Sequence, residues 1–379
     1  MAGAAVNTPR GGPRVVIAHD NLWWYGGAER IIATAAEALP DAPIWTVLGR
    51  REVAQRMGVE DRVHALLPEW EPLLRGYRAL APFYPPLIRF RRLPEADVLL
   101  TSSFAFAHHF STRNHAPQLC YCYSPLRMAW SMTDAYGDEV GGGVLGRRAV
   151  RALAAWLRAT DRRAARRVTR YVAESRFVAH QIERFYGRRA DVIYPPVDCE
   201  LFRPSERDHD GYFLFCGRLV EAYKRPSIVV DAFRGLSHRL VIAGTGPALD
   251  GLKRRAGPNV EFVGHLGDSD LVPLMQRCAA VIFPSRDDFG LIPVEVMACG
   301  RPVIAYGAGG ALETIVAGRT GEFFAEQTAD AVGAAVRNFD PDAYDPRDIR
   351  SHAEQWREER FVSEMLDAVS ETAAGAGDA

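Results

Sequence analysis

Two carboxylates in the second half of the chain are the first candidates for chemistry. Asp287 and Glu295 lie in the run DDFGLIPVE, with seven residues between them. Carboxylates hydrogen-bond hydroxyl groups, and the apolar neighbours Val294 and Val296 mean that a charge at Glu295 needs a polar partner. The simpler alternative is that Asp287 is a solvated loop acid and that Glu295 only interacts favourably with a helix dipole.

A predicted α/β unit positions these two acids. The apolar runs Ala279 to Pro284 and Pro302 to Tyr306 predict buried parallel strands. Between them, Pro293 suits the first turn of a short helix and Gly300 suits its end, so that Glu295 is expected in the first turn. Because ligands bind beyond the carboxyl ends of such strands, we expect the acids and the glycine loop at 307–310 on one ligand-binding edge.

Two cations follow an earlier predicted strand. The strand at Tyr212 to Cys216 runs into GRLVEAYKR, which contains Arg218 and Lys224. Both can be ordinary surface cations. At the ligand-binding edge they would instead bind a diphosphate, and they would stabilise the charge of a departing nucleoside diphosphate without a metal.

The first half of the chain offers a second glycine loop. Arg14 to Asp20 predicts a strand, and Gly26 and Gly27 precede an alanine-rich helix at Ala28 to Leu39. The amide groups at the start of such a helix can face an anion, although two glycines also suit a simple turn.

Tyr123 is the polar candidate of a later strand in this half. It lies in the predicted strand Gln118 to Ser124, near the crevice-facing end. His19 and Asp20, at the end of the first strand, are the next polar candidates, and solvation in a loop is their alternative role.

Length, composition and charge bound the class of protein. The chain has 379 residues, 48% of them hydrophobic, which is enough for two domains with full cores. A formal net charge of −1 argues against nucleic acid as the main partner. The six cysteines are scattered through apolar patterns, which predicts reduced thiols in a cytoplasmic protein. The first residues lack an apolar leader and predict a flexible tail.

The order of apolar runs predicts two doubly wound domains. We place them at residues 1–200 and 201–351, with a linker at Arg203 to Asp210 and a helix crossing back to the first domain within 352–379. The other predicted strands are Pro43 to Leu48, Ala96 to Ser103, Tyr171 to Glu174, Asp191 to Tyr194, Arg239 to Ala243 and Val260 to Val263.

Two further segments bear on possible surfaces. Arg147 to Arg170 carries nine arginines in a helical background, so it is either a solvated face or a contact with anionic lipid. Tyr77 to Phe90 is aromatic and too rich in proline for a long helix. We expect this second segment to pack in the core, the alternative being an acceptor-side or membrane-touching surface.

The motifs resemble those of retaining glycosyltransferases with the GT-B fold, the glycogen-synthase-like and bacterial mannosyl- and glucosyltransferases. DDFGLIPVEVMACG is similar to their pattern of two glutamates separated by seven residues, with Asp287 where glutamate is usual. GRLVEAYKR resembles their Arg and Lys spacing. LCYCYSPLR resembles the Tyr-Cys-His-x-Pro-x-Arg run of a mannosyltransferase subgroup, with Tyr123 where histidine is usual.

The resemblance implies two Rossmann-like domains facing across a cleft and transfer of a hexose, of the mannose or glucose type, from a GDP- or UDP-linked donor. It implies that Arg218 and Lys224 bind the diphosphate, that Glu295 binds the ribose, and that Asp287 and Tyr123 act on the sugar. The donor contacts that complete the implied set are Gly26, Gly27, Gly244, Phe289, Gly290 and Leu291. No cofactor or metal is expected, and the acceptor is a hydroxyl of a glycan, a glycolipid or a small molecule.

Alternatives from other classes remain open at this point. One is an epimerase or hydrolase of sugar nucleotides on the same fold, and another is an inactive partner of a glycosyltransferase complex. Asp268 and Asp270 match an Asp-x-Asp metal motif, but they precede an apolar helical run, so Asp268 or Ser269 is predicted to be a helix N-cap.

Overall fold

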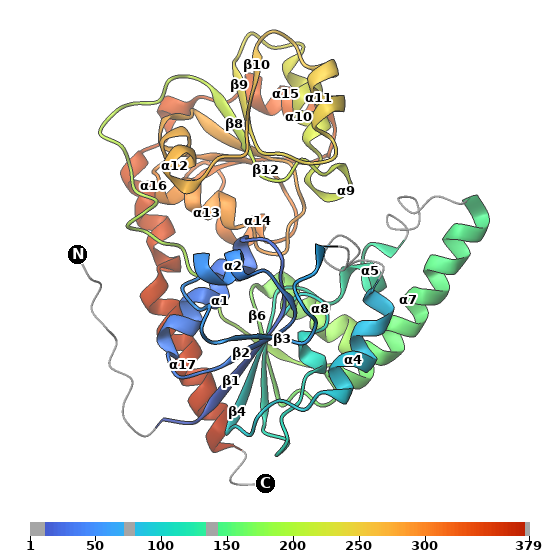
Figure 1. Ribbon diagram of the computed structural model, residues 1–379. Coiled ribbons are helices and arrows are strands. Elements are labelled where there is room, and N and C mark those ends of the chain that lie inside the picture. The colour runs from blue at the N-terminus through green and yellow to red at the C-terminus, as the bar shows by residue number, and fades with distance from the viewer. Residues whose placement is uncertain (1–11, 72–79, 134–142, 376–379) are drawn as a thin grey trace. The chain divides into compact units, whose positions relative to one another are not determined.

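The chain forms two compact units in the computed structural model, which describes residues 12–71, 80–133 and 143–375 (Figure 1). Unit 1 comprises residues 1–194 and 361–379, and unit 2 comprises residues 195–360. The chain therefore changes unit after Tyr194 and again after Arg360, whereas the sequence-predicted boundaries were 200 and 351. The two units are described separately below.

Unit 1 is built on a parallel seven-stranded sheet in the order β3-β2-β1-β4-β5-β6-β7. The central strands β1, β4 and β5 are almost fully buried because they consist of apolar runs covered by helices. The strands are β1 (Val15–Leu22), β2 (Ile44–Gly49), β3 (Val63–Ala65), β4 (Val98–Ser103), β5 (Gln118–Cys122), β6 (Arg170–Ala173) and β7 (Ala190–Val192).

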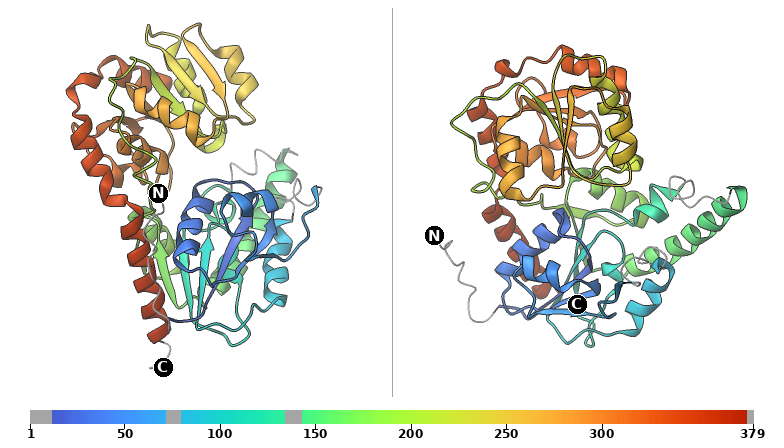
Figure 2. Two further views of the ribbon diagram at one scale, coloured as in Figure 1. Left: turned by 60° about the vertical axis from the view of Figure 1, so that its left-hand side comes forward. Right: turned by 45° about the horizontal axis from the view of Figure 1, so that its top comes forward.

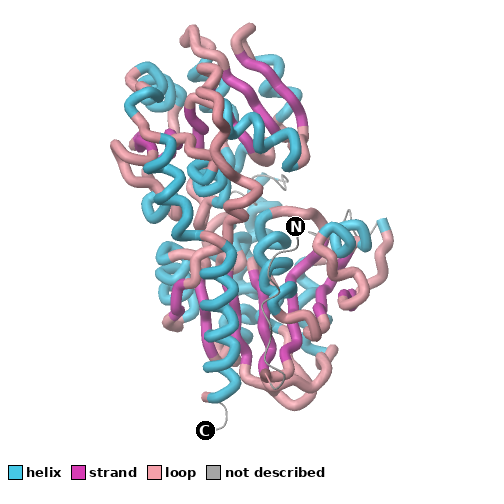
Figure 3. Tube along the Cα trace, turned by 90° about the vertical axis from the view of Figure 1, so that its left-hand side faces the viewer, coloured by secondary structure: helices cyan, strands magenta, loops and turns pink. Residues whose placement is uncertain are grey.

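The helices of unit 1 cover this sheet and include the C-terminal helix. That helix lies along the strands (Figures 2 and 3). Its Phe361 packs edge-on against Tyr121, and its Glu371 pairs with Arg170 at 2.6 Å. The helices are α1 (Gly27–Ala38), α2 (Arg51–Arg56), η1 (Ala81–Phe83), α4 (Tyr84–Phe90), η2 (Ala107–His109), α5 (Arg127–Trp130), α7 (Gly143–Ala165), α8 (Arg176–Tyr186) and α17 (Glu358–Ala374).

Unit 2 repeats the plan with a parallel six-stranded sheet in the order β10-β9-β8-β11-β12-β13. Its strands are β8 (Phe213–Cys216), β9 (Leu240–Ala243), β10 (Val260–Gly264), β11 (Ala280–Phe283), β12 (Val303–Tyr306) and β13 (Gly321–Phe324). Its helices are α9 (Glu221–Lys224), α10 (Pro226–Phe233), α11 (Leu249–Arg255), α12 (Asp268–Arg277), α13 (Leu291–Ala298), α14 (Ala311–Thr314), α15 (Ala329–Arg337), η3 (Pro341–Ala343), α16 (Pro346–Ala353) and η4 (Glu354–Trp356).

Every strand predicted from the sequence is present, and the described residues contain two more that were missed. Both missed strands, β3 and β13, lie at sheet edges, where a strand is short and half exposed and so lacks a continuous apolar run. The six cysteines are all free and buried, as predicted, and burial raises the pKa of Cys120 and of Cys216 to about 12.

Three predictions about connections need correction. The expected linker at 203–210 packs on unit 2, where the Arg207 carbonyl accepts a hydrogen bond of 3.0 Å from Arg301. The expected helix at 352–372 is interrupted, because Arg357 is extended and its backbone bridges Val197. Helix α12 has Gly267 as its N-cap, so Asp268 is its first residue.

Candidate functional site

The order of strands in unit 2 reverses between β8 and β11, and the predicted site residues lie there. Chain connections run outward from β8 to β9 and β10 on one side and from β11 to β12 and β13 on the other. Such a reversal leaves a crevice at the carboxyl ends of the two central strands. Arg218 and Lys224 follow β8, and Asp287 and Glu295 follow β11. The fold thus brings together four residues that the sequence separates by up to 77 positions, from 218 to 295.

Lys224 and Asp287 are in direct contact. The Lys224 ammonium forms an ion pair with the Asp287 carboxylate, both side chains being less than one-fifth exposed. The ammonium also lies 5.6 Å from the centre of the Phe283 ring. The sequence predicted separate roles for these two residues, whereas the structure shows that they form an ion pair.

Arg218 differs from Lys224 in having no counter-charge. Its side chain is exposed, and it makes no ion pair with any residue that the structure describes. A guanidinium in this position keeps all of its donors available for a ligand, and its planar fork suits phosphate oxygens.

Glu295 is buried, with 4% of its surface exposed, in the second turn of α13. The prediction that Glu295 lies in the first turn was wrong. The helix begins at Leu291, after Gly290 in a left-handed conformation (φ 88°) as N-cap, so Glu295 is its fifth residue. Phe289 points inward and packs near Trp356, with 6.3 Å between ring centres. Its contribution to a ligand would therefore come from the backbone.

Glycines allow the loops of this edge to approach one another through their backbones. The Gly244 amide donates a hydrogen bond of 2.6 Å to the Gly264 carbonyl, and a Cβ at Gly244 would overlap the Gly217 carbonyl. Likewise, the Gly310 amide donates to the Asp287 carbonyl at 3.0 Å, and a Cβ at Gly310 would overlap the Phe289 backbone. The beginnings of α13 and α14 therefore lie side by side, with amide groups near one crevice.

Unit 1 has a corresponding reversal between β1 and β4, and Tyr123 lies in a polar network beside it. The Tyr123 hydroxyl donates to the Ala28 carbonyl at 3.1 Å and contacts the Ser102 hydroxyl at 2.8 Å. Ser102 in turn contacts His19 Nδ1 at 2.9 Å. The phenol thus joins β5 to the start of α1, and burial raises its pKa well above the ordinary value, so it is neutral.

Glu29 connects this network to the predicted glycine loop. One of its carboxylate oxygens accepts a hydrogen bond of 3.0 Å from the Gly26 amide, and the other lies 3.7 Å from His19 Nε2. Gly27 is the first residue of α1. The sequence identified Gly26 and Tyr123 separately, and the structure connects them through Glu29, His19 and Ser102.

Solvation in a loop was the wrong alternative for His19 and Asp20. Both lie within β1 and are fully buried. The Asp20 carboxylate accepts backbone hydrogen bonds from residues 104 to 107, including 2.8 Å from Ala105 and 2.6 Å from Ala107. Asp20 therefore fixes the loop after β4, which is a structural task.

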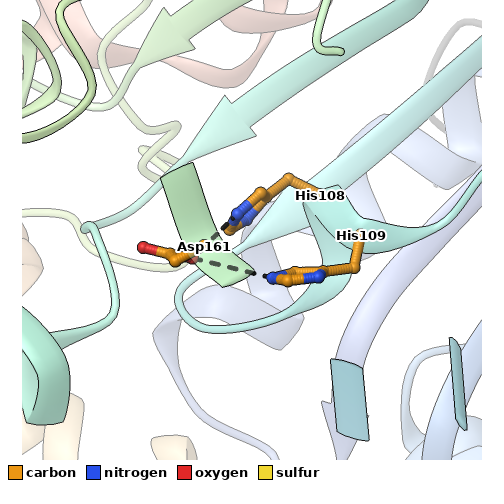
Figure 4. A group of neighbouring side chains, drawn as sticks. All are labelled: His108, His109 and Asp161. Carbon is orange, nitrogen blue, oxygen red and sulfur yellow. Dashed lines mark ion pairs between the residues drawn. The ribbon is translucent and has the colours of Figure 1, made fainter. Parts of the chain in front are cut away.

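A buried cluster of His108, His109 and Asp161 was not predicted (Figure 4). Both imidazoles point at the same carboxylate oxygen, with His108 Nε2 at 2.9 Å and His109 Nε2 at 3.7 Å. The other oxygen accepts a hydrogen bond of 2.6 Å from the Trp130 indole. The residue types suit a metal. The ion pair of His108 with Asp161 links η2 to α7. Among the described residues, the Asp161 Oδ1 atom and the Nε2 atoms of both histidines are buried without a hydrogen bond.

The cluster predicts a pH-dependent stability. Burial lowers the pKa of His109 from 6.5 to about 4, with Arg167 acting in the same direction and Asp161 opposing it. Between these values the unfolded chain binds a proton that the folded chain excludes, so stability is present above pH 6.5 and falls as the pH drops toward 4. We expect the free energy of unfolding, measured with urea, to fall by about 1.4 kcal/mol for each unit by which the pH is lowered in this range.

Substitution assigns this slope to one residue. His109→Gln should flatten the dependence of the unfolding free energy on pH between 6.5 and 4. His180→Gln, at an exposed position, should leave that dependence unchanged. A slope that survives His109→Gln would contradict the assignment.

Comparison with known proteins shows which families the chain resembles. Residues 25–201 match the model of Glycosyltransferase Family 4, and residues 210–339 match that of Glycosyl transferases group 1. The chain is similar to the group 1 and family 4 glycosyltransferases. The two matches fall on successive halves of the chain, in the same order as the two sheets.

Curated relatives and solved structures agree with this similarity. The chain is 33% identical over 185 residues to D-inositol 3-phosphate glycosyltransferase 1 of Catenulispora acidiphila, which covers 40% of this chain and 44% of the relative. An uncharacterized glycosyltransferase of Methanocaldococcus jannaschii is 29% identical, with 40% and 43% covered. The chain thus aligns with less than half the length of these relatives.

The structural neighbours establish the fold class as GT-B. The Anabaena protein HepE in complex with UDP has a TM-score of 0.70 at 17% identity, covering 94% of this chain and 99% of that one. Sucrose-phosphate synthase from Thermosynechococcus elongatus has a TM-score of 0.69 at 17% identity, covering 96% and 100%. The two Rossmann-like units predicted from the sequence are confirmed.

Proposed function

We propose that this glycosyltransferase moves a hexose from a nucleoside diphosphate sugar to an acceptor hydroxyl, with retention at the anomeric carbon. The observation that carries the proposal is the set of Arg218, Lys224, Asp287 and Glu295 at the strand reversal of unit 2. Solved structures of the Anabaena neighbour hold UDP and UDP-glucose, which supports a donor of this class.

The charges of the site suggest the role of each group. Arg218 and Lys224 would bind the diphosphate, since both are cations beyond the carboxyl end of β8. The Lys224–Asp287 pair holds the Asp287 carboxylate in place, and the incoming diphosphate would take over part of the lysine's charge. Asp287 and the backbone amides of residues 289–291 would then bind sugar hydroxyls, while Glu295 would accept hydrogen bonds from the ribose.

The chemical step that fits these groups is a front-face displacement. The bond between the anomeric carbon and the leaving phosphate oxygen breaks, the bond to the acceptor oxygen forms on the same face, and the acceptor proton passes to the leaving diphosphate. Arg218 and Lys224 would stabilise the negative charge that develops there, which is the type of interaction that accelerates transfer most. In unit 1, Gly26 and Gly27 would border the diphosphate, and Tyr123, whose hydroxyl is already bonded, would act mainly by positioning them.

The direct test is a donor screen followed by a transfer assay. UDP- and GDP-linked glucose and mannose are screened for an increase in melting temperature, and stabilising donors are incubated with acceptors bearing free hydroxyls. Transfer with retained configuration supports the proposal. Release of free sugar without transfer would favour a hydrolase, and binding without turnover would favour an inactive partner.

We expect activity without a divalent metal. Arg218 and Lys224 already supply positive charge to the diphosphate, and Asp268 and Asp270 belong to the first turn of α12. The transfer assay is run with excess chelator and again with added magnesium or manganese. Turnover that disappears with chelator and returns with added metal would show that Arg218 and Lys224 alone do not support transfer.

Glu295→Gln should weaken donor binding about tenfold, because a carboxylate forms stronger hydrogen bonds to ribose hydroxyls than an amide does. The change preserves the shape of this buried side chain. Calorimetric titration with UDP or GDP measures the effect, and circular dichroism checks the fold. An unchanged affinity would remove Glu295 from the donor site.

Peripheral contact with a membrane belongs to the same proposal and is supported by α7. This helix carries several exposed arginines, and Val144 and Leu145 near its first residues are 63% and 78% exposed. Among the described residues, no helix is both long and apolar enough to cross a bilayer. We propose that the enzyme lies in the cytoplasm and contacts an anionic membrane surface through α7.

A further inference from the structure

A pocket of about 430 Å³ lies between α4 and α7 of unit 1. Figures 1 and 2 show these two helices side by side. Pro85 and Phe90 of α4 and Trp156 of α7 give it apolar walls, and His109 also lines it. Phe90 is 86% exposed and Trp156 is 42% exposed, so the entrance presents aromatic surface to solvent.

Three exposed arginines line the pocket. Arg89, Arg163 and Arg167 make no ion pair with any residue in the described part of the chain. Burial lowers the pKa of Arg167, and the charges of Arg89, Arg92 and Arg163 lower it further. Like charges gathered around partly desolvated apolar walls are unfavourable unless an anion compensates them.

The spacing along α7 directs one stripe of side chains into this pocket. Trp156, Thr160 and Arg163 of α7 are separated by four and three positions, and Arg167 follows four positions later in the turn after the helix; all of them line the pocket. Such spacing is one face of a helix. A ring and two guanidinium groups on one face suit a ligand that has an apolar part joined to an anion.

The pocket is separate from the candidate donor site. Arg167 lies between the end of α7 and the start of β6 at Arg170, and Phe90 precedes the start of β4 at Val98. The pocket is therefore near the amino ends of the unit 1 strands, whereas nucleotides bind at carboxyl ends in this class of fold. The same positive charges oppose a metal ion at the neighbouring His108–His109–Asp161 cluster.

We infer that this pocket binds a phosphate monoester or diester attached to an apolar group. Phosphate oxygens match the fork of a guanidinium, and an alkyl or aromatic group would pack between Phe90 and Trp156. The ligand chemistry is shared by a phospholipid headgroup and by a soluble organic phosphate. This inference does not depend on the proposed sugar transfer.

Titration of the full chain with hexyl phosphate, followed by tryptophan fluorescence, tests the inference. We expect saturable binding that is tighter than that of inorganic phosphate, because only hexyl phosphate has the apolar part. Arg163→Gln/Arg167→Gln should weaken it about tenfold or more. Arg166→Gln removes one charge from the adjacent position outside the pocket and should change affinity less than twofold. Trp156→Phe should abolish most of the fluorescence change.

Sedimentation with vesicles distinguishes the two sources of phosphate. Binding to phosphatidylglycerol vesicles, but not to phosphatidylcholine vesicles, that is lost in the double variant assigns the pocket to a lipid headgroup. Binding of hexyl phosphate without vesicle recruitment assigns it to a soluble phosphate. No saturable binding of hexyl phosphate, or equal losses in the double variant and Arg166→Gln, would overturn the inference. Circular dichroism of each variant separates lost binding from lost folding.

Discussion

Arg218→Ala is expected to slow sugar transfer about a hundredfold or more while leaving the fold intact. The Arg218 side chain is exposed and has no ion-pair partner among the described residues, so its removal breaks no internal contact of that kind. A cation directed at a leaving diphosphate contributes most in the transition state, and the loss should therefore appear in kcat more than in donor affinity. Turnover at saturating donor measures it.

Two variants control for a general effect of charge. Arg254→Ala removes an exposed arginine of α11 in the same unit and should retain full activity. Arg218→Lys keeps the charge but not the planar fork and should recover part of the rate. If Arg218→Ala keeps more than half of the wild-type turnover, Arg218 does not bind the diphosphate.

Gly310→Ala is expected to lower the stability of unit 2 by about 1–3 kcal/mol and to weaken donor binding. The backbone of Gly310 is helical (φ −63°, ψ −22°), so alanine adopts it without strain. Its Cβ would nevertheless overlap the backbone of Phe289, and that loop would have to move. The melting temperature should therefore fall by several degrees. Donor affinity should fall as well, because the same loop offers the amides of residues 289–291.

The neighbouring glycine provides a matched control. A Cβ at Gly307 would have its nearest contact at 3.6 Å, which is an ordinary packing distance. Gly307→Ala should therefore leave melting temperature and donor affinity nearly unchanged. Equal behaviour of the two alanine variants would show that close packing of these two loops is not required.

The sequence by itself determined the secondary structure that frames the unit 2 site. Continuous apolar runs such as 279–284 and 302–306 form buried parallel strands. A strand that is covered on both faces is apolar at successive positions, so a continuous apolar run predicts it. Placing Arg218, Lys224, Asp287 and Glu295 after such strands was sufficient to predict that they share one edge. The edge strands β3 and β13 were not predicted, because their residues are partly exposed and do not form a continuous apolar run.

Tertiary structure decided the partners of each side chain. Sequence spacing does not show that Lys224 pairs with Asp287, because the contact joins loops from two strands that are neighbours only in the folded sheet. It likewise does not show that Asp20 binds four amides of a loop more than eighty residues away, or that the Tyr123 hydroxyl is occupied by Ala28 and Ser102. The arginine pocket has the same origin: α4 and α7 are distant in the chain, and only their packing in unit 1 gathers Arg89, Arg163 and Arg167 around one volume. Local pattern fixes which face of an element is buried, while long-range packing fixes which charges meet.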